Sequence, residues 1–197
     1  MKNIIIYLVS LSCILSCSYD TEQMDPLSYL TWMTDLSNSF KQTKNIGDLN
    51  FTLQYKTSDY IIAMETLNKH YSKEQYTKRK MELEGMEYFT FTIQNKSDHT
   101  HSQSATEMLD MKEYASFEME KDFSLIVEKD TVKPGLYLFE QQSEINNTFL
   151  FLLAFPKQTN SNKKITFSYD DNLFDTGIIN YVFQQEDLES QPTMLYK

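Results

Sequence analysis

Alternation of apolar and polar residues marks much of the chain and predicts strands. Residues 51–55 and 88–93 alternate strictly, which is typical of half-buried strands. From Phe123 onward, turn-rich connections separate five further strand-like segments: FSLIVEKD, GLYLFEQQ, FLFLLAF, KITFSYDD and GIINYVFQQ. Phe149–Phe155 is apolar on both faces, which is typical of a strand covered on both sides. Gly47-Asp48, between two extended runs, predicts a tight hairpin turn.

Three segments have helical character instead. Residues 58–85 contain many helix formers and predict one or two helices, with a break near Tyr71-Ser72. A further helix is expected over 104–115. Asp25-Pro26 favours a short helix after it, because proline suits a first helical turn. A strand through Tyr29–Met33 is the competing interpretation, and the pattern does not separate the two.

Together these segments predict a mainly β protein with helical insertions, of the α+β class. Many short strands with such connections favour an antiparallel β-sandwich. An immunoglobulin-like sandwich is the first expectation, without the buried cysteine pair of antibody domains, because both cysteines lie near the start of the chain.

The chain begins with MKN and an apolar run, IIIYLVSLSCILS, that ends at Cys17. This run suits the core of a signal peptide and is shorter than the ~20 residues that span a bilayer as a helix. The sequence Ile14-Leu15-Ser16-Cys17 resembles the lipobox of bacterial lipoproteins. The resemblance implies that Cys17 is acylated and that the chain is cut just before it. Cys13 is a less suitable acylation site, and an ordinary signal peptide or an uncut anchor is the alternative.

This interpretation divides the chain into three parts. Residues 1–16 are the expected lipoprotein signal peptide, residues 17–25 a flexible tether, and residues 26–197 a single β-rich domain with a helical insertion around 58–85. The tether carries Asp20, Glu22 and Asp25 without lysine or arginine. It resembles the acidic surface-export signal of many Bacteroidetes lipoproteins. Cleavage before Cys17 would leave no cysteine for a disulfide or a thiolate metal site.

The whole chain is similar to uncharacterised Bacteroidetes lipoproteins of the outer membrane or cell surface. The segments that carry this resemblance are ILSC, GDLNFTLQYK, SDYIIAME, DFSL, LYLFE and TFSYDDNLFDTGIINYVF. The resemblance implies a lipid-anchored envelope location and no particular activity.

The charge of the chain limits its partners. It has 28 acidic residues against 18 lysines and arginines, a formal net charge of −10. An acidic domain repels nucleic acid and anionic lipid headgroups. We therefore expect no nucleic-acid binding and attachment to the membrane through the lipid alone.

Two clusters have residue types that bind metals. Asp98, His99 and His101 place two imidazoles and a carboxylate within four residues, although an ordinary polar loop is the favoured interpretation. Oxygen ligands for calcium are available from Asp170, Asp171 and Asp175, but without the spacing of a known calcium loop.

The segment Phe174–Ile178 contains the Asp-Thr-Gly sequence that resembles the active-site turn of aspartic proteases. That chemistry requires two carboxylates that share a proton, and the chain has one copy of the motif. An ordinary turn between two strands is the favoured interpretation.

No other motif indicates catalysis. The chain lacks G-x-S-x-G, H-E-x-x-H and a glycine-rich phosphate loop. We therefore expect no catalytic residue, no cofactor and no enzymatic activity. A binding or accessory role with a protein or glycan partner in the envelope is the leading hypothesis, with unknown binding residues. The alternatives are an inhibitor or immunity factor against a secreted toxin, and a glycan hydrolase with carboxylates that the sequence does not locate.

Overall fold

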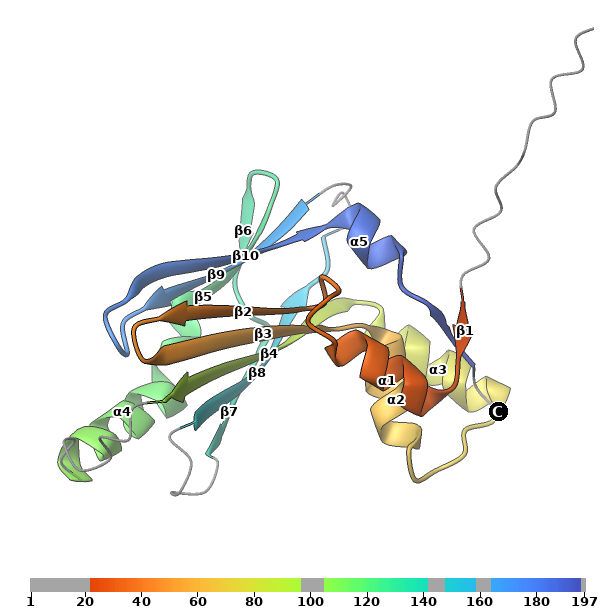
Figure 1. Cartoon of the computed structure of the whole chain (residues 1–197), viewed down its shortest axis with the longest axis horizontal. Coiled ribbons are helices and arrows are strands. Elements are labelled where there is room, and N and C mark those ends of the chain that lie inside the picture. The colour runs from red at the N-terminus through yellow and green to blue at the C-terminus, as the bar shows by residue number, and fades with distance from the viewer. Residues whose placement is uncertain (1–21, 97–104, 142–147, 159–163, 196–197) are drawn as a thin grey trace, which may run out of the picture.

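The computed structural model describes residues 22–96, 105–141, 148–158 and 164–195, and Figure 1 shows their arrangement. The larger of two antiparallel sheets has five strands in the order β2-β3-β4-β8-β7. Its strands are β2 (Lys41–Ile46), β3 (Leu49–Lys56), β4 (Met86–Asn95), β8 (Thr148–Pro156) and β7 (Leu136–Gln141). The smaller sheet has the order β10-β9-β5-β6. Its strands are β10 (Gly177–Gln184), β9 (Lys164–Asp171), β5 (Phe123–Val127) and β6 (Asp130–Val132).

The two sheets pack face to face through aromatic side chains. The ring centre of Phe91 on β4 lies 5.0 Å from that of Tyr169 and 5.7 Å from that of Phe167, both on β9. The hydroxyl of Tyr181 donates to the backbone oxygen of Phe51, at 2.8 Å, and links β10 to β3. The predicted antiparallel sandwich with helical insertions is therefore confirmed.

The immunoglobulin-like strand order is not found. In that fold strand C leaves the sheet that contains strands A and B. Here β2, β3 and β4 follow one another within the five-stranded sheet. The hairpins β5–β6 and β9–β10 then belong to the smaller sheet, and the hairpin β7–β8 between them belongs to the larger one. The alternation of apolar and polar residues fixes which face of each strand is buried, but it does not fix this order.

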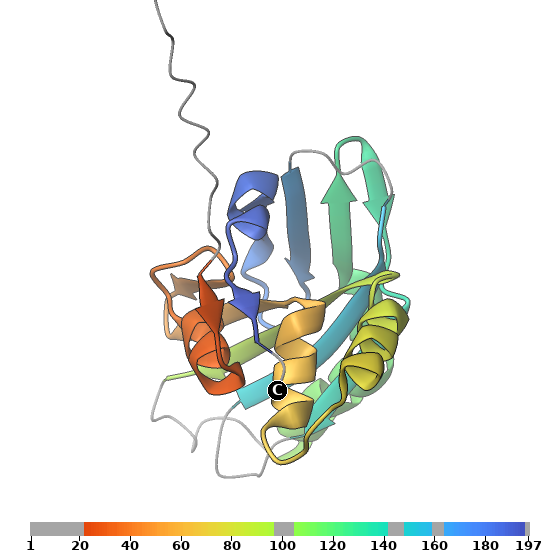
Figure 2. The same cartoon turned by 90° about the vertical axis from the view of Figure 1, so that its right-hand side faces the viewer.

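Helices cover both ends of the sandwich (Figure 1). Helices α1 (Pro26–Thr34), α2 (Ser58–Thr66) and α3 (Lys73–Leu83) lie at one end, and Figure 2 shows them in front of the two sheets. Helix α4 (Ala105–Phe117) lies at the other end and leads through a short 3-10 helix, Met119–Asp122, into β5. Helix α5 (Gln185–Glu189) follows β10.

Capping side chains explain where these helices begin. The Asp25 carboxylate accepts from the backbone amides of Leu27 and Ser28, at 3.0 and 3.2 Å, so the helix predicted after Asp25-Pro26 forms and the strand alternative is wrong. Ser72 and Gln75 form a reciprocal capping box at the start of α3. This cap explains the break predicted near Tyr71-Ser72.

A short parallel strand pair corrects the predicted limits of the flexible tether. Strand β1 (Gln23–Met24) pairs with β11 (Thr193–Met194), so residues near both ends of the described chain lie side by side. Met194 is buried and Met24 packs against the core. Of the predicted tether, residues 17–21 lie outside the described residues. The residues from Gln23 to Asp25 belong to the folded domain.

Candidate binding groove

The outer face of the five-stranded sheet carries a groove about the size of a ligand site. Its volume is about 530 Å³, within the range of roughly 300–1,000 Å³ for small-molecule sites. It is bordered by the end of α1, the first turn of α2, and strands β2, β3 and β4. Hydroxyl and amide groups dominate its lining: Thr34, Thr43, Thr52, Thr90, Thr92, Asn50 and Gln54, together with Leu36, Lys41, Lys56 and Tyr60.

Strand alternation places these polar side chains on one face. Phe51, Leu53 and Tyr55 of β3 point into the core, so the residues between them point outward. The register aligns Gln54 of β3 with Thr90 of β4. The same row continues into Leu152 of β8 and Leu138 of β7. A polar groove therefore adjoins an aliphatic strip on the same sheet face.

Two buried polar atoms in this row have no hydrogen-bond partner among the described residues. They are Oε1 of Gln54 and Oγ1 of Thr90, on residues directly opposite each other. Gln54 is only 7% exposed, and its Nε2 donates to the backbone oxygens of Met33 and Tyr55, both at 3.0 Å. These bonds hold the amide in place and leave its oxygen free. Buried polar groups without partners are unfavourable and rare, and neither of these two oxygens is exposed to the groove.

Replacing Thr90 with valine is expected to raise the free energy of unfolding by about 1 kcal/mol. The substitution keeps the shape of the side chain and removes a buried hydroxyl that has no partner. Valine also suits a strand position. Chemical denaturation of both proteins measures the change, and Thr166→Val on the outer face of the other sheet is the control. A clear loss of stability in Thr90→Val would show that this hydroxyl has a partner within the protein.

A smaller polar pocket lies where β3 and β4 meet α2 and α3, with a volume of about 210 Å³. The hydroxyl of Tyr55 donates to the buried carboxylate of Glu87, and the Lys157 ammonium lies 3.9 Å from that carboxylate. Burial above all, and then the charge of Glu87, raise the pKa of Tyr55 well above its ordinary value. Asp59 pairs with Lys80 at 3.0 Å. The carboxylates of Glu87 and Asp59 therefore already have partners within the protein.

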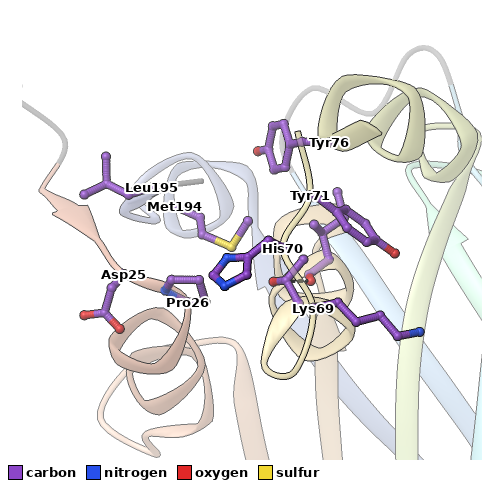
Figure 3. Close-up of a pocket in the computed structure, with 10 residues that line it drawn as sticks. Asp25, Pro26, Lys69, His70, Tyr71, Tyr76, Met194 and Leu195 are labelled. Carbon is purple, nitrogen blue, oxygen red and sulfur yellow. Dashed lines mark hydrogen bonds between the residues drawn. The ribbon is translucent and has the colours of Figure 1, made fainter. Parts of the chain in front are cut away.

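A third cavity, of about 170 Å³, is mainly apolar and lies between α1, α2, the loop before α3 and β11. Figure 3 shows the imidazole of His70 on the side of Pro26 and Met194. Ile62 and Met194 are buried, whereas Lys69 and His70 are exposed. The cavity is below the usual size of a ligand site.

The predicted calcium ligands are not brought together. Asp170 and Asp171 are successive residues of β9 and point to opposite faces, so Asp170 is exposed and Asp171 is buried. Asp171 accepts from the backbone amides of Leu173, Phe174 and Thr176. In the described part of the chain, no group of three His, Cys, Asp or Glu residues is arranged to hold a metal.

The Asp175-Thr176-Gly177 segment forms the turn between β9 and β10. Asp175 and Gly177 both have positive φ angles, of 58° and 83°, which suit a turn. The hydroxyl and the amide of Thr176 both donate to Asp171. The segment is therefore held as a structural turn.

The remaining predicted sites lie outside the described residues. These are the acylation site Cys17, its alternative Cys13, and the metal-binding candidates Asp98, His99 and His101. None of the helices in the described ranges has the length and apolar character needed to cross a bilayer.

Comparisons with known proteins add little. No family model and no curated protein matches the chain. Among solved structures, the chain is similar to a DUF4426 family protein from Pseudomonas aeruginosa, at 10% identity over 74% of this chain and 93% of the other, with a TM-score of 0.35. A likeness at this level supports no conclusion about function.

Proposed function

We propose that this chain is a lipid-anchored protein of a bacterial outer membrane that binds an envelope saccharide in the sheet-face groove and catalyses no reaction. The observation that carries the proposal is a groove of ligand size whose lining consists mainly of threonine hydroxyls and side-chain amides. A hydroxyl group both donates and accepts hydrogen bonds, so sugar hydroxyls can pair with the hydroxyls and amides of this lining.

The rest of the groove supports the same ligand class. Threonine hydroxyls and the Asn50 amide add donors and acceptors along it. Tyr60 of α2 lines one side of the groove. Leu152 and Leu138 follow Thr90 in the row of outward residues that crosses the sheet. Apolar side chains beside polar groups suit a sugar ring, which has hydroxyls at its edge and C–H groups on its faces.

The lining does not favour the glycan hydrolase alternative. Glycoside hydrolysis requires a pair of carboxylates beside the scissile bond. No Asp or Glu is among the described residues that line the groove. The immunity-factor alternative depends on an acidic surface, and no specific contact region of the described residues supports it over saccharide binding.

Saccharide binding is testable with the purified protein on an array of bacterial surface oligosaccharides. We expect binding, and we expect Thr92→Val, which removes a hydroxyl from the groove lining, to weaken it about tenfold, the effect of one lost hydrogen bond of about 1.4 kcal/mol. Thr166→Val is the matched control and should bind as the wild type does. Absence of saccharide binding, or equal losses in both variants, would contradict the proposal.

Lipid attachment has its own test. Replacing Cys17 with alanine is expected to abolish acylation, because the thiol is the proposed site of the lipid. Cells are labelled with a fatty-acid probe, and the captured protein is compared with wild type and with Cys13→Ala. We expect label in wild type and Cys13→Ala and none in Cys17→Ala. Undiminished label in Cys17→Ala would overturn the assignment of the anchor.

A further inference from the structure

We propose that the groove selects an acidic saccharide, one whose sugar rings carry carboxylates. This inference rests on the proposed saccharide binding and names the ligand class. It follows from the position of Lys41 and Lys56 in a groove whose described lining includes no acidic residue.

The charge of the groove is opposite to that of the chain. Acidic residues outnumber lysines and arginines by 28 to 18 in the sequence, yet Lys41 and Lys56 are the charged residues among those that line the groove. The negative charge of Glu140 on β7 acts on Lys56. Glu140 lies on the same outer face of the sheet, in the row that also contains Leu150 and Thr92. The described lining of the groove therefore has two positive charges and no negative one, which favours anions. Lys56 also lines the smaller polar pocket, where Asp59 and Glu87 pair with Lys80 and Lys157.

The strand register places the two lysines beside the unpaired amide oxygen. Lys41 of β2 lies directly opposite Gln54 of β3, and Lys56 is the next outward residue along β3. A saccharide that lies over this part of the sheet would thus be near ammonium groups that can pair with a ring carboxylate. Charge-assisted hydrogen bonds of this kind are stronger than those between neutral groups.

Lys56 is partly desolvated, which strengthens its interaction with an anion. Its ammonium lies 5.8 Å from the centre of the Tyr60 ring. Burial lowers the pKa of Lys56, and the charge of Glu140 partly offsets this effect. An ammonium that has already lost part of its water gives up less hydration when it pairs with a carboxylate.

The groove continues around the edge of the sheet. A second depression, of about 550 Å³, shares Leu36, Lys41 and Thr43 with the first and extends to Gln42 and Val182. No acidic residue is among the described residues that line it.

Tetragalacturonate and its methyl ester provide a matched pair of probes, because esterification removes the charges and keeps the ring hydroxyls. We expect calorimetry with the purified protein to show about tenfold tighter binding of the acid, lost in Lys56→Gln and reduced in Lys41→Gln. Binding of the acid should weaken with added salt. Lys164→Gln, an exposed lysine on β9, should behave as the wild type does.

The outcomes separate this inference from the proposed function. Equal binding of the acid and the ester, with no effect of Lys41→Gln or Lys56→Gln, would overturn acid selection and leave saccharide binding intact. Tighter binding of the ester would also overturn acid selection. Failure of both probes to bind would overturn acid selection, and an array without binders would overturn the proposed function as well.

Discussion

Phe91→Ala is expected to lower the free energy of unfolding by about 4 kcal/mol, the largest effect of any substitution proposed for this protein. Phe91 is fully buried between the sheets. Its ring centre lies within 6.3 Å of six other aromatic rings: Phe51, Phe123, Phe151, Phe167, Tyr169 and Tyr181. Truncation leaves a cavity that these rigid rings fill poorly, so the transfer and cavity costs add.

Denaturant titration measures this effect, with Phe117→Ala as the matched control. Phe117 is 81% exposed at the end of α4, and its truncation should change stability by less than about 0.5 kcal/mol. A domain of this kind has roughly 5–15 kcal/mol of stability, so Phe91→Ala removes a large part of it. Equal effects of the two substitutions would contradict the packing of the sheets through Phe91.

Asp171→Ala is expected to lower the free energy of unfolding by about 3 kcal/mol. The buried carboxylate accepts from the hydroxyls of Tyr169 and Thr176, at 2.6 and 2.5 Å. It also accepts from the backbone amides of Leu173, Phe174 and Thr176, at 3.2, 3.0 and 3.1 Å. Removal of the carboxylate leaves these donors in the β9–β10 turn without their acceptor.

Asp170→Ala is the control for this effect, because Asp170 is the adjacent residue on the exposed face of β9. Its substitution should leave stability nearly unchanged. Thermal and denaturant unfolding of both variants give the comparison. If Asp171→Ala is no less stable than Asp170→Ala, the carboxylate does not hold the turn.

Local patterns were sufficient to predict much of the fold. The alternation at 51–55 and 88–93 corresponds to β3 and β4, and the five segments after Phe123 correspond to strands β5 and β7–β10. Gly47 has a φ angle of 55° in the predicted hairpin turn. The helical insertion contains α2 and α3. These features depend on neighbouring residues, which is why the sequence specifies them.

Long-range pairing was not predictable in the same way. The β1–β11 pair joins two-residue strands far apart in the sequence, and two residues show no periodicity. The order of the strands in the sheets was also not predictable, because the alternation of apolar and polar residues indicates which face of a strand is buried and not which strand lies beside it. The prediction that Phe149–Phe155 is covered on both sides was only partly right, because Leu150 and Leu152 are half-buried on the outer face of β8.

The groove likewise combines features that local patterns predict with a long-range contact that they do not. Alternation already placed Thr52 and Gln54 on the polar face of a predicted strand. The sequence did not show that the end of α1 lies over that face, where Met33 receives a hydrogen bond from Gln54 and fixes its amide. That contact joins residues separated by 21 positions, and it leaves the amide oxygen without a partner.

The most direct test of the saccharide-binding groove is NMR of the purified protein with labelled threonine methyl groups, titrated with tetragalacturonate and with its methyl ester. Thr52, Thr90 and Thr92 line the groove, whereas Thr131 and Thr166 lie on the other sheet. We predict that at least one probe shifts the signals of the groove threonines and leaves those of Thr131 and Thr166 unchanged. Shifts of Thr131 and Thr166 with the groove threonines unchanged, for either of these probes or for a saccharide that the array identifies, would contradict the assignment of this sheet face as the binding site.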